Sequence, residues 1–246
     1  MKNPEVRRML VYGATGKAGR LTVERALREG WTVSAFVRNP DKVPEVLRSK
    51  LTIVKGDLCD AASISAAVHS CRPHAIVDAS SAIPFGHAKG QSPNNADRGV
   101  IIKATFEALV SDGRLADCVL LIVSGQLLPE PGGAINSWSV AATAWVLRTV
   151  LARKVWRDSE QAVAWCFQHT PPSFRFVYVR MGHMLEAPSR GPLRAEATLN
   201  NIQHGSVSYV DVAAALVRLA SDEMRTWERK ALFFNYAIPE AREPGK

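Results

Sequence analysis

The sequence predicts an α/β protein built on a doubly wound parallel sheet, and three observations support this prediction. Short apolar segments that fit strands alternate with helical segments at least five times along the chain. Short loops join most of these segments, as expected of βαβ units. The segment 118–125 is apolar almost throughout, which is typical of a strand in the middle of a parallel sheet.

Each expected element has a local signal. The first strand, 9–12, is apolar, and the helix over 18–28 ends before Gly30, which suits a C-terminal cap. Asp60 marks the start of another helix, and the Pro-, Gly- and Arg-rich segment 183–197 is predicted to be a loop. The remaining strands are expected at 31–39, 51–57, 74–80, 118–125, 174–182 and 231–238, and the remaining helices at 41–47, 61–70, 100–113, 141–168 and 209–222.

The chain is long enough for one large domain with a sizeable core. It has 246 residues, of which 47% are hydrophobic, and it contains no repeat and no clear linker. We therefore expect a single domain over 1–246 with a small C-terminal elaboration. The elements on the substrate side are expected mainly at 83–98 and 183–246.

Charge and cysteine use exclude several classes of function. The net charge of +8 favours anionic partners, but the basic residues are scattered, so nucleic-acid binding is not expected. The four cysteines form no C-x-x-C pair, which indicates a reducing compartment and no metal site. No apolar run is long enough for a membrane span and no signal peptide is evident. We expect a cytoplasmic protein that binds no membrane.

Three glycines stand three residues apart directly after the first strand. The stretch VYGATGKAGR contains Gly13, Gly16 and Gly19. In a phosphate-binding turn the first permits a tight turn, the second a close approach to a pyrophosphate, and the third close packing of helix and sheet. The helix N-terminus would offer N–H groups to the phosphates, and Thr15 adds a hydroxyl donor. The spacing is G-x-x-G-x-x-G, so a purely structural turn remains the alternative.

An arginine follows the second strand at the position that separates the two nicotinamide dinucleotides. NAD sites usually place a carboxylate there to bind the ribose 2′-OH. This sequence instead has Arg38, about 20 residues beyond the glycines. A guanidinium suits a 2′-phosphate, so the residue predicts a preference for NADPH over NADH. The alternative is an arginine that only faces solvent.

Several motifs together resemble the extended and atypical short-chain dehydrogenase/reductases. GATGKAG, VRNPDK and VKGDL match this superfamily near the N-terminus, and FVYVRMGHM and GSVSYVDVAAALVRL match it later. The similarity covers roughly 9–238 and points to the NAD(P)H-binding, NmrA-like and biliverdin reductase B (flavin reductase)-like members. It implies a Rossmann fold that binds NADP(H).

The resemblance also implies the residues of the site. Ser124, at the end of the fifth strand, matches a hydroxyl near the nicotinamide and is a candidate catalytic residue. The implied cofactor-binding set is Gly13, Thr15, Gly16, Lys17, Ala18 and Gly19 at the pyrophosphate, Arg38 at the 2′-phosphate, Asp57 and Leu58 at the adenine, and Ala79, Ser80 and Ser81 along the ribose and nicotinamide.

The sequence departs from the superfamily at the acid/base pair. Alcohol-oxidising members use Tyr-x-x-x-Lys, in which the lysine lowers the pKa of the tyrosine. None of the four tyrosines has a lysine four residues later, and Lys154, the candidate for the motif's lysine, has Val150 at the tyrosine position. The pair Arg180-Met181 also stands where the superfamily usually has Arg-Pro, at the end of the sixth strand. His183 is a candidate substrate contact or proton donor, with an ordinary loop histidine as the alternative.

These observations favour two functions. The first is an NADPH-dependent oxidoreductase that transfers hydride to a flavin, quinone, aldehyde or ketone, with 83–98 and 183–197 over the substrate. The second is a non-catalytic NADP(H)-binding sensor or regulatory protein of NmrA type, which the missing Tyr-x-x-x-Lys pair supports. A nucleotide-sugar epimerase is disfavoured by the short C-terminal part and the missing tyrosine. We expect a monomer or a homodimer with a small-molecule substrate.

Overall fold

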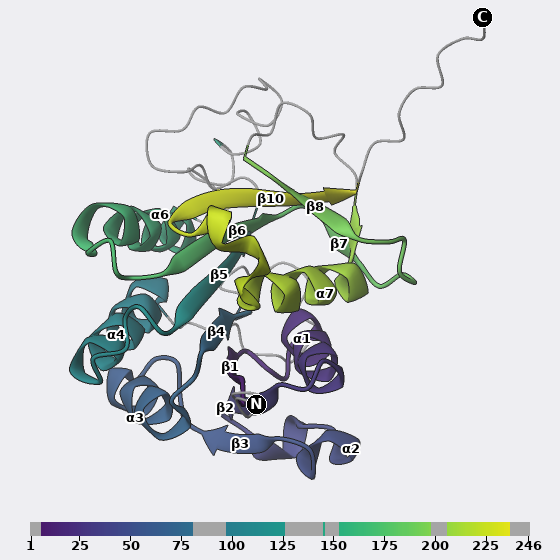
Figure 1. Cartoon of the computed structure of the whole chain (residues 1–246), viewed down its shortest axis with the longest axis horizontal. Helices are drawn as coiled ribbons and strands as arrows, with labels where there is room; N and C mark the ends of the chain where they lie inside the picture. The colour runs from purple at the N-terminus through teal and green to yellow at the C-terminus, as the bar shows by residue number, and fades with distance from the viewer. Residues whose placement is uncertain (1–5, 81–96, 126–144, 146–152, 198–205, 237–246) are drawn as a thin grey trace, which may run out of the picture.

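A computed structural model describes residues 6–80, 97–125, 145, 153–197 and 206–236. Its centre is an eight-stranded sheet, and Figure 1 shows helices on both faces of that sheet. The strands are β1 (Arg8–Tyr12), β2 (Thr32–Val37), β3 (Thr52–Lys55), β4 (Ala75–Asp78), β5 (Val119–Gly125), β6 (Phe176–Met181), β7 (Met184–Leu185), β8 (Leu193–Glu196), β9 (Val207–Ser208) and β10 (Lys230–Tyr236). The α-helices are α1 (Lys17–Arg28), α2 (Glu45–Arg48), α3 (Ala61–Cys71), α4 (Arg98–Ser111), α6 (Arg153–His169) and α7 (Tyr209–Ala220), with 3₁₀ turns at Pro40–Lys42 and Asp222–Trp227.

The order of the strands confirms the predicted doubly wound sheet. It runs β3-β2-β1-β4-β5-β6-β10-β8, so the chain winds outward from β1 in one direction and from β4 in the other. All pairs in this sheet are parallel except β10 with β8, which is antiparallel. Crevices at the carboxyl ends of the strands, where the order reverses, are the usual ligand sites of such sheets. Here the reversal lies between β1 and β4.

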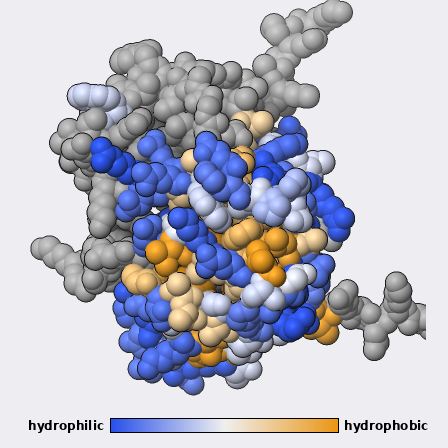
Figure 2. All heavy atoms as spheres, turned by 90° about the vertical axis from the view of Figure 1, so that its left-hand side faces the viewer, coloured by the Kyte–Doolittle hydropathy of each residue, from blue (hydrophilic) through white to orange (hydrophobic). Residues whose placement is uncertain are grey.

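Both faces of the sheet are buried, which explains the continuous apolar strands. Met9 and Val11 belong to the core under α1 and α7, whereas Leu10 and Tyr12 belong to the core under α3, α4 and α6. Figure 2 shows the face at the left of Figure 1, where hydrophilic side chains surround smaller apolar patches. Within the described ranges, no helix has the length and apolar character needed to cross a bilayer.

The expected helix ends agree with the structure. The Asp60 carboxylate accepts a hydrogen bond from the Ala62 amide at 3.0 Å, so it caps α3. Gly30 has a φ of 79° just beyond α1, which is the conformation that favours glycine. Part of the expected helix over 141–168 lies outside the described residues, and α6 is its described part.

The prediction of a loop over residues 183–197 is wrong in part. Leu193–Glu196 forms β8, the last strand of the sheet, and a two-residue strand, β7, pairs with β9. The Leu193 side chain is 2% exposed and pairs with Tyr236 of β10. Local composition hides this strand because its stability comes from pairing with a segment some forty residues away, as is common for strands.

Candidate dinucleotide-binding site

The turn after β1 is shaped by its first and third glycines. Gly13 has a φ of 70°, and a Cβ atom there would lie 2.9 Å from the carbonyl oxygen of Ala79. A Cβ atom on Gly19 would collide with the carbonyl oxygen of Gly13. Side chains at these positions would therefore separate the turn from β4 and from its own helix. The two glycines have the structural roles that the sequence predicts.

The second glycine leaves the start of α1 open. Gly16 is the N-cap residue and has no side chain that could cap the helix, so the N-cap provides no acceptor for the first amide groups. Thr15, Gly16 and Lys17 are all exposed. A Cβ atom on Gly16 would lie 3.3 Å from the Gly13 oxygen, which leaves little room for a larger residue. Exposed amides at a helix N-terminus fit the pyrophosphate of a dinucleotide.

An ion pair connects this turn to the segment that follows β7. The Lys17 ammonium contacts the carboxylate of Glu186, and both side chains are mostly exposed. Their hydrogen bond and mutual attraction raise the pKa of Lys17 and lower the pKa of Glu186. Sequence reasoning placed Lys17 in the turn but missed Glu186, because no local pattern joins residues so far apart.

Arg38 and Asp57 follow the neighbouring strands β2 and β3. Arg38 is exposed and makes no hydrogen bond or ion pair with another described residue. The Asp57 carboxylate accepts a hydrogen bond from the Cys59 amide at 2.9 Å, and the adjacent Leu58 is buried. Burial raises the pKa of the Cys59 thiol, and the charge of Arg38 opposes that shift. Arg38 therefore lies close to the loop that begins at Asp57.

A buried ion pair joins the ends of β4 and β5 to the start of α4. The Asp78 carboxylate is fully buried, and its Oδ2 lies 3.5 Å from Nη1 of Arg98, which is 5% exposed. Arg98 also donates hydrogen bonds to the carbonyl oxygens of Val123, at 2.9 Å, and Ser80, at 3.1 Å. The Ser80 hydroxyl donates to Asp78, so this hydroxyl already has a partner within the protein.

Sequence reasoning missed this pair. A detectable signal was the acidic residue that ends the apolar strand HAIVD, because a charge in a buried strand needs a partner. Nothing local identified Arg98 as that partner. Ala79 is partly buried and follows the same strand, whereas Ser81 lies outside the described residues.

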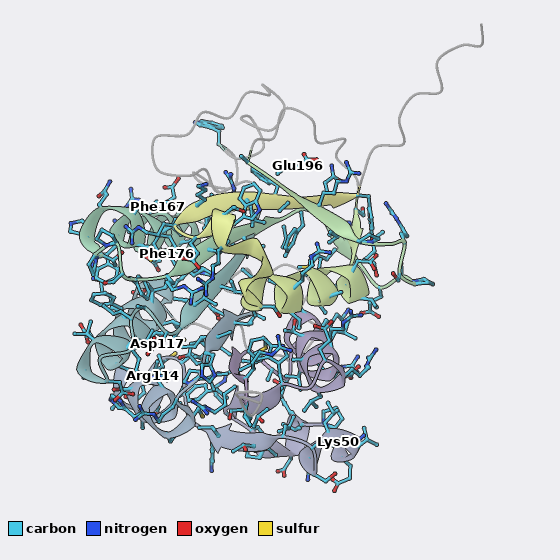
Figure 3. The ribbon with its side chains drawn as sticks, in the orientation of Figure 1. Lys50, Arg114, Asp117, Phe167, Phe176 and Glu196 are labelled. Atoms are coloured by element: carbon cyan, nitrogen blue, oxygen red, sulfur yellow. The ribbon has the colours of Figure 1, made fainter. Side chains whose placement is uncertain are left out.

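The candidate catalytic residues, Ser124 and Lys154, lie on β5 and α6. Ser124 is 9% exposed at the end of β5 and pairs with Arg180 of β6. Tyr178, two residues earlier on β6, is fully buried; burial raises its pKa, and the Ser124 side chain opposes this shift. Lys154 lies in the first turn of α6, and Val150 is outside the described residues. Phe167 and Phe176, with ring centroids 5.0 Å apart, pack α6 against β6 (Figure 3).

His183 lies in the link between β6 and β7. Its ring is exposed, and Nδ1 lies 3.2 Å from Oγ of Ser206. Its carbonyl oxygen accepts a hydrogen bond from the amide of Val207 at 2.9 Å. The structure thus places His183 beside the short β7–β9 pair. Its proposed contact with substrate stays a prediction.

The predicted residues therefore gather along one edge of the sheet. The glycine turn, Arg38, Asp57, Ala79 and Ser124 each lie at the carboxyl end of a parallel strand, from β1 to β5. A doubly wound sheet with an open glycine turn at its reversal point defines a dinucleotide-binding protein of the Rossmann type.

Comparison with known proteins supports this class. The NAD(P)H-binding family matches residues 13–223, and the chain belongs to that family. It is 28% identical over 134 residues to a dihydroflavonol 4-reductase from Dianthus caryophyllus, across 51% of this chain and 34% of that protein. The chain spans about a third or less of the length of the curated relatives that it matches.

Solved structures share the fold across almost the whole chain. One is an anaerobillin reductase from Escherichia coli O157:H7, with a TM-score of 0.65 and 20% identity over 94% of this chain and 99% of that chain. Another is a short-chain dehydrogenase/reductase from Veillonella parvula in complex with NADP, with a TM-score of 0.67 and 13% identity over 94% of each chain. At these identities the similarity establishes the fold.

Proposed function

We propose that the protein is an NADPH-dependent oxidoreductase that transfers hydride to a small planar or carbonyl-type substrate. The observation that carries this proposal is the pairing of an open α1 N-terminus at Gly16 with an exposed Arg38 at the end of the next strand. No carboxylate occupies the strand end where an NAD site usually has one. Similar proteins that are named reductases, and a similar structure that holds NADP, support the same assignment.

The residues of the chain would bind and orient the dinucleotide. The first amides of α1 would hold the pyrophosphate, and Arg38 would hold the 2′-phosphate through charge-assisted hydrogen bonds. The nicotinamide would supply the hydride. The Asp78–Arg98 pair would fix the ends of β4 and β5 beside the ring. Ser124 would donate a hydrogen bond to the substrate oxygen, and solvent would supply the proton in place of the missing tyrosine.

A second candidate is an NADP(H)-binding sensor without catalytic activity. The observation in its favour is that three of the tyrosines are buried or already hydrogen-bonded within the protein. The side chains of Tyr12 and Tyr178 are fully buried, and the hydroxyl of Tyr236 donates to Asp211 at 2.5 Å. These three tyrosines are therefore unsuited to act as the superfamily's catalytic phenol.

Dinucleotide oxidation with a panel of acceptors separates the two candidates. We expect NADPH to be oxidised in the presence of at least one flavin, quinone, aldehyde or ketone, and NADH to be oxidised more slowly. Ser124→Ala should lower kcat while NADPH affinity stays unchanged. Tight NADP⁺ binding without turnover of any acceptor would favour the sensor. A protein that binds neither dinucleotide would contradict both candidates.

A further inference from the structure

A hollow of about 590 Å³ lies beside the edge strand β8, outside the dinucleotide site. Its walls come from the segment before β8, from β8 itself, from the last turn of α7 and from the end of β10. Pockets that bind small molecules usually enclose about 300–1,000 Å³. The hollow is therefore large enough for a metabolite.

Three arginines, Arg190, Arg194 and Arg218, line this hollow, and no acidic residue of the described chain lines it. Arg194 pairs with Asn235 in the sheet, and its exposed side chain has no hydrogen bond or ion pair with another described residue. Arg190 donates to the carbonyl oxygen of Ser206 at 3.2 Å, and Arg218 donates to that of Leu193 at 2.6 Å. A guanidinium has five N–H donors, so most of them remain available to a ligand. The charge of Arg190 attracts the Asp211 carboxylate and lowers its pKa, whereas Arg218 adds a second positive charge at the hollow.

The wall that carries Arg190 is held in place by a buried carboxylate. Asp211 of α7 is 4% exposed and accepts hydrogen bonds from the Ser189 hydroxyl at 2.5 Å, the Arg190 amide at 2.9 Å and the Tyr236 hydroxyl at 2.5 Å. The guanidinium of Arg190 stacks 4.0 Å from the centre of the Tyr236 ring. The site therefore needs little ordering when a ligand binds, which favours affinity.

The lining combines these charges with apolar surface. Leu193 and Pro192 lie between the arginines, and the Tyr236 ring is half-buried at the end of β10. Glu196 of β8 points away from α7 (Figure 3), and Arg194, two residues earlier on the same strand, lies on the same face as Glu196. A ligand that matches this surface carries an apolar body and at least one negative group.

The hollow lies beside a different strand from the glycine turn. β8 stands five places from β1 in the sheet. At about 4.8 Å between neighbouring strands, these two strands are about 24 Å apart. The segment before β8 nevertheless approaches the turn, because Glu186, four residues before Arg190, contacts Lys17, so competition with NADP⁺ is the test of separate binding.

We propose that this hollow binds a small organic anion, whose carboxylate or phosphate group is held by Arg190 and Arg218 while its apolar body packs on Tyr236. Guanidinium groups bind both kinds of oxyanion through paired hydrogen bonds. This site is separate from the dinucleotide site, and its existence does not depend on the proposed reductase activity.

Calorimetry with simple probes tests the proposal. Phenyl phosphate, benzene-1,3-dicarboxylate, inorganic phosphate and acetate are titrated at constant ionic strength, with and without saturating NADP⁺. We expect at least one aromatic anion to bind with one-to-one stoichiometry, more tightly than inorganic phosphate and acetate, whether NADP⁺ is present or not. The tighter of the two aromatic probes identifies the preferred oxyanion.

Variants locate the binding. Arg218→Glu should weaken binding of the aromatic anion about tenfold or more, because it removes a charge-assisted contact and adds a repulsive one. Arg218→Gln, which only removes the charge, should weaken binding less. Arg157→Glu, an equal charge change at an exposed position of α6, is the matched control and should have no effect. The proposal is overturned if no probe binds saturably, if NADP⁺ displaces the probe, or if Arg157→Glu weakens binding as much as Arg218→Glu.

Discussion

The two ends of the sheet present two kinds of site. At the β1–β3 end, the candidate dinucleotide site is built largely from backbone, within one turn and the ends of consecutive strands. At the β10–β8 end, the arginine hollow is built from side chains on three separate segments. The comparison teaches that a site made of backbone leaves glycines at fixed spacing, whereas a site made of side chains leaves no local pattern. The predictions below test the stability of the sheet and the separation of its two ends, from the largest expected effect to the smallest.

Removal of the arginine between the two ends should have the largest effect on stability. Arg98→Ala would leave the fully buried Asp78 without its charged partner. Loss of one member of a buried ion pair destabilises a protein by about 3–5 kcal/mol. Urea denaturation of the variant should show this loss. Arg20→Ala, which breaks an exposed pair with Glu24, should change the free energy of unfolding by less than about 1 kcal/mol. Equal effects of the two variants would contradict the structural role of Asp78.

Gly19→Ala should disrupt the dinucleotide end alone. The new methyl group would collide with the carbonyl oxygen of Gly13, and overpacking of this kind destabilises proteins by about 1–3 kcal/mol. We expect calorimetry to show loss of NADPH binding while the aromatic anion that the wild type prefers still binds at the hollow. The control is Gly30→Ala, which is strained by the positive φ of Gly30 but lies beyond the other end of α1, where a Cβ atom meets nothing within 4 Å. That variant should keep NADPH affinity. Normal NADPH binding by Gly19→Ala would contradict the role of the turn.

Two buried thiols predict a loss of stability at alkaline pH. Burial raises the pKa of Cys118 and of Cys166 to about 12, from an ordinary value of 9.0. Above pH 9 the unfolded thiols lose their protons while the folded ones keep them, so stability falls as pH rises toward 12. The slope is at most about 1.4 kcal/mol per pH unit for each thiol. Urea denaturation between pH 7 and about pH 10.5 should give a shallower slope for Cys118→Ala than for the wild type; identical slopes would count against this assignment.

Chemical labelling of Cys59 should detect NADPH binding at the dinucleotide end without any substitution, and it has the smallest expected effect. Cys59 is exposed and lies close enough to Arg38 for that charge to act on its thiol. We expect NADPH to slow alkylation of Cys59 several-fold, measured by mass spectrometry of the labelled peptide. The partly exposed Cys71 should be unaffected and serves as the internal control. If phenyl phosphate alone slowed the alkylation of Cys59, the claim that the two ends bind their ligands separately would be contradicted.

Much of the fold and part of the site were predictable for a physical reason. Continuous apolar strands and glycines that collide with backbone when substituted leave a signal in the local sequence, and the positions of Gly13, Gly19 and Arg38 follow from it. The strand β8 and the Asp78–Arg98 pair were missed because they form through contacts between distant segments. Neither composition nor spacing reports which distant residue completes such a contact.

The central claim is that Arg38 selects NADPH, and calorimetry of one variant tests it most directly. Arg38→Asp replaces the exposed guanidinium at the end of β2 with a carboxylate. The variant should bind NADPH about tenfold or more weakly, because charge-assisted bonds to the 2′-phosphate become repulsion, and should bind NADH almost as well as the wild type does. Equal loss of affinity for both dinucleotides, or no loss for either, would contradict the assignment of Arg38 to the 2′-phosphate.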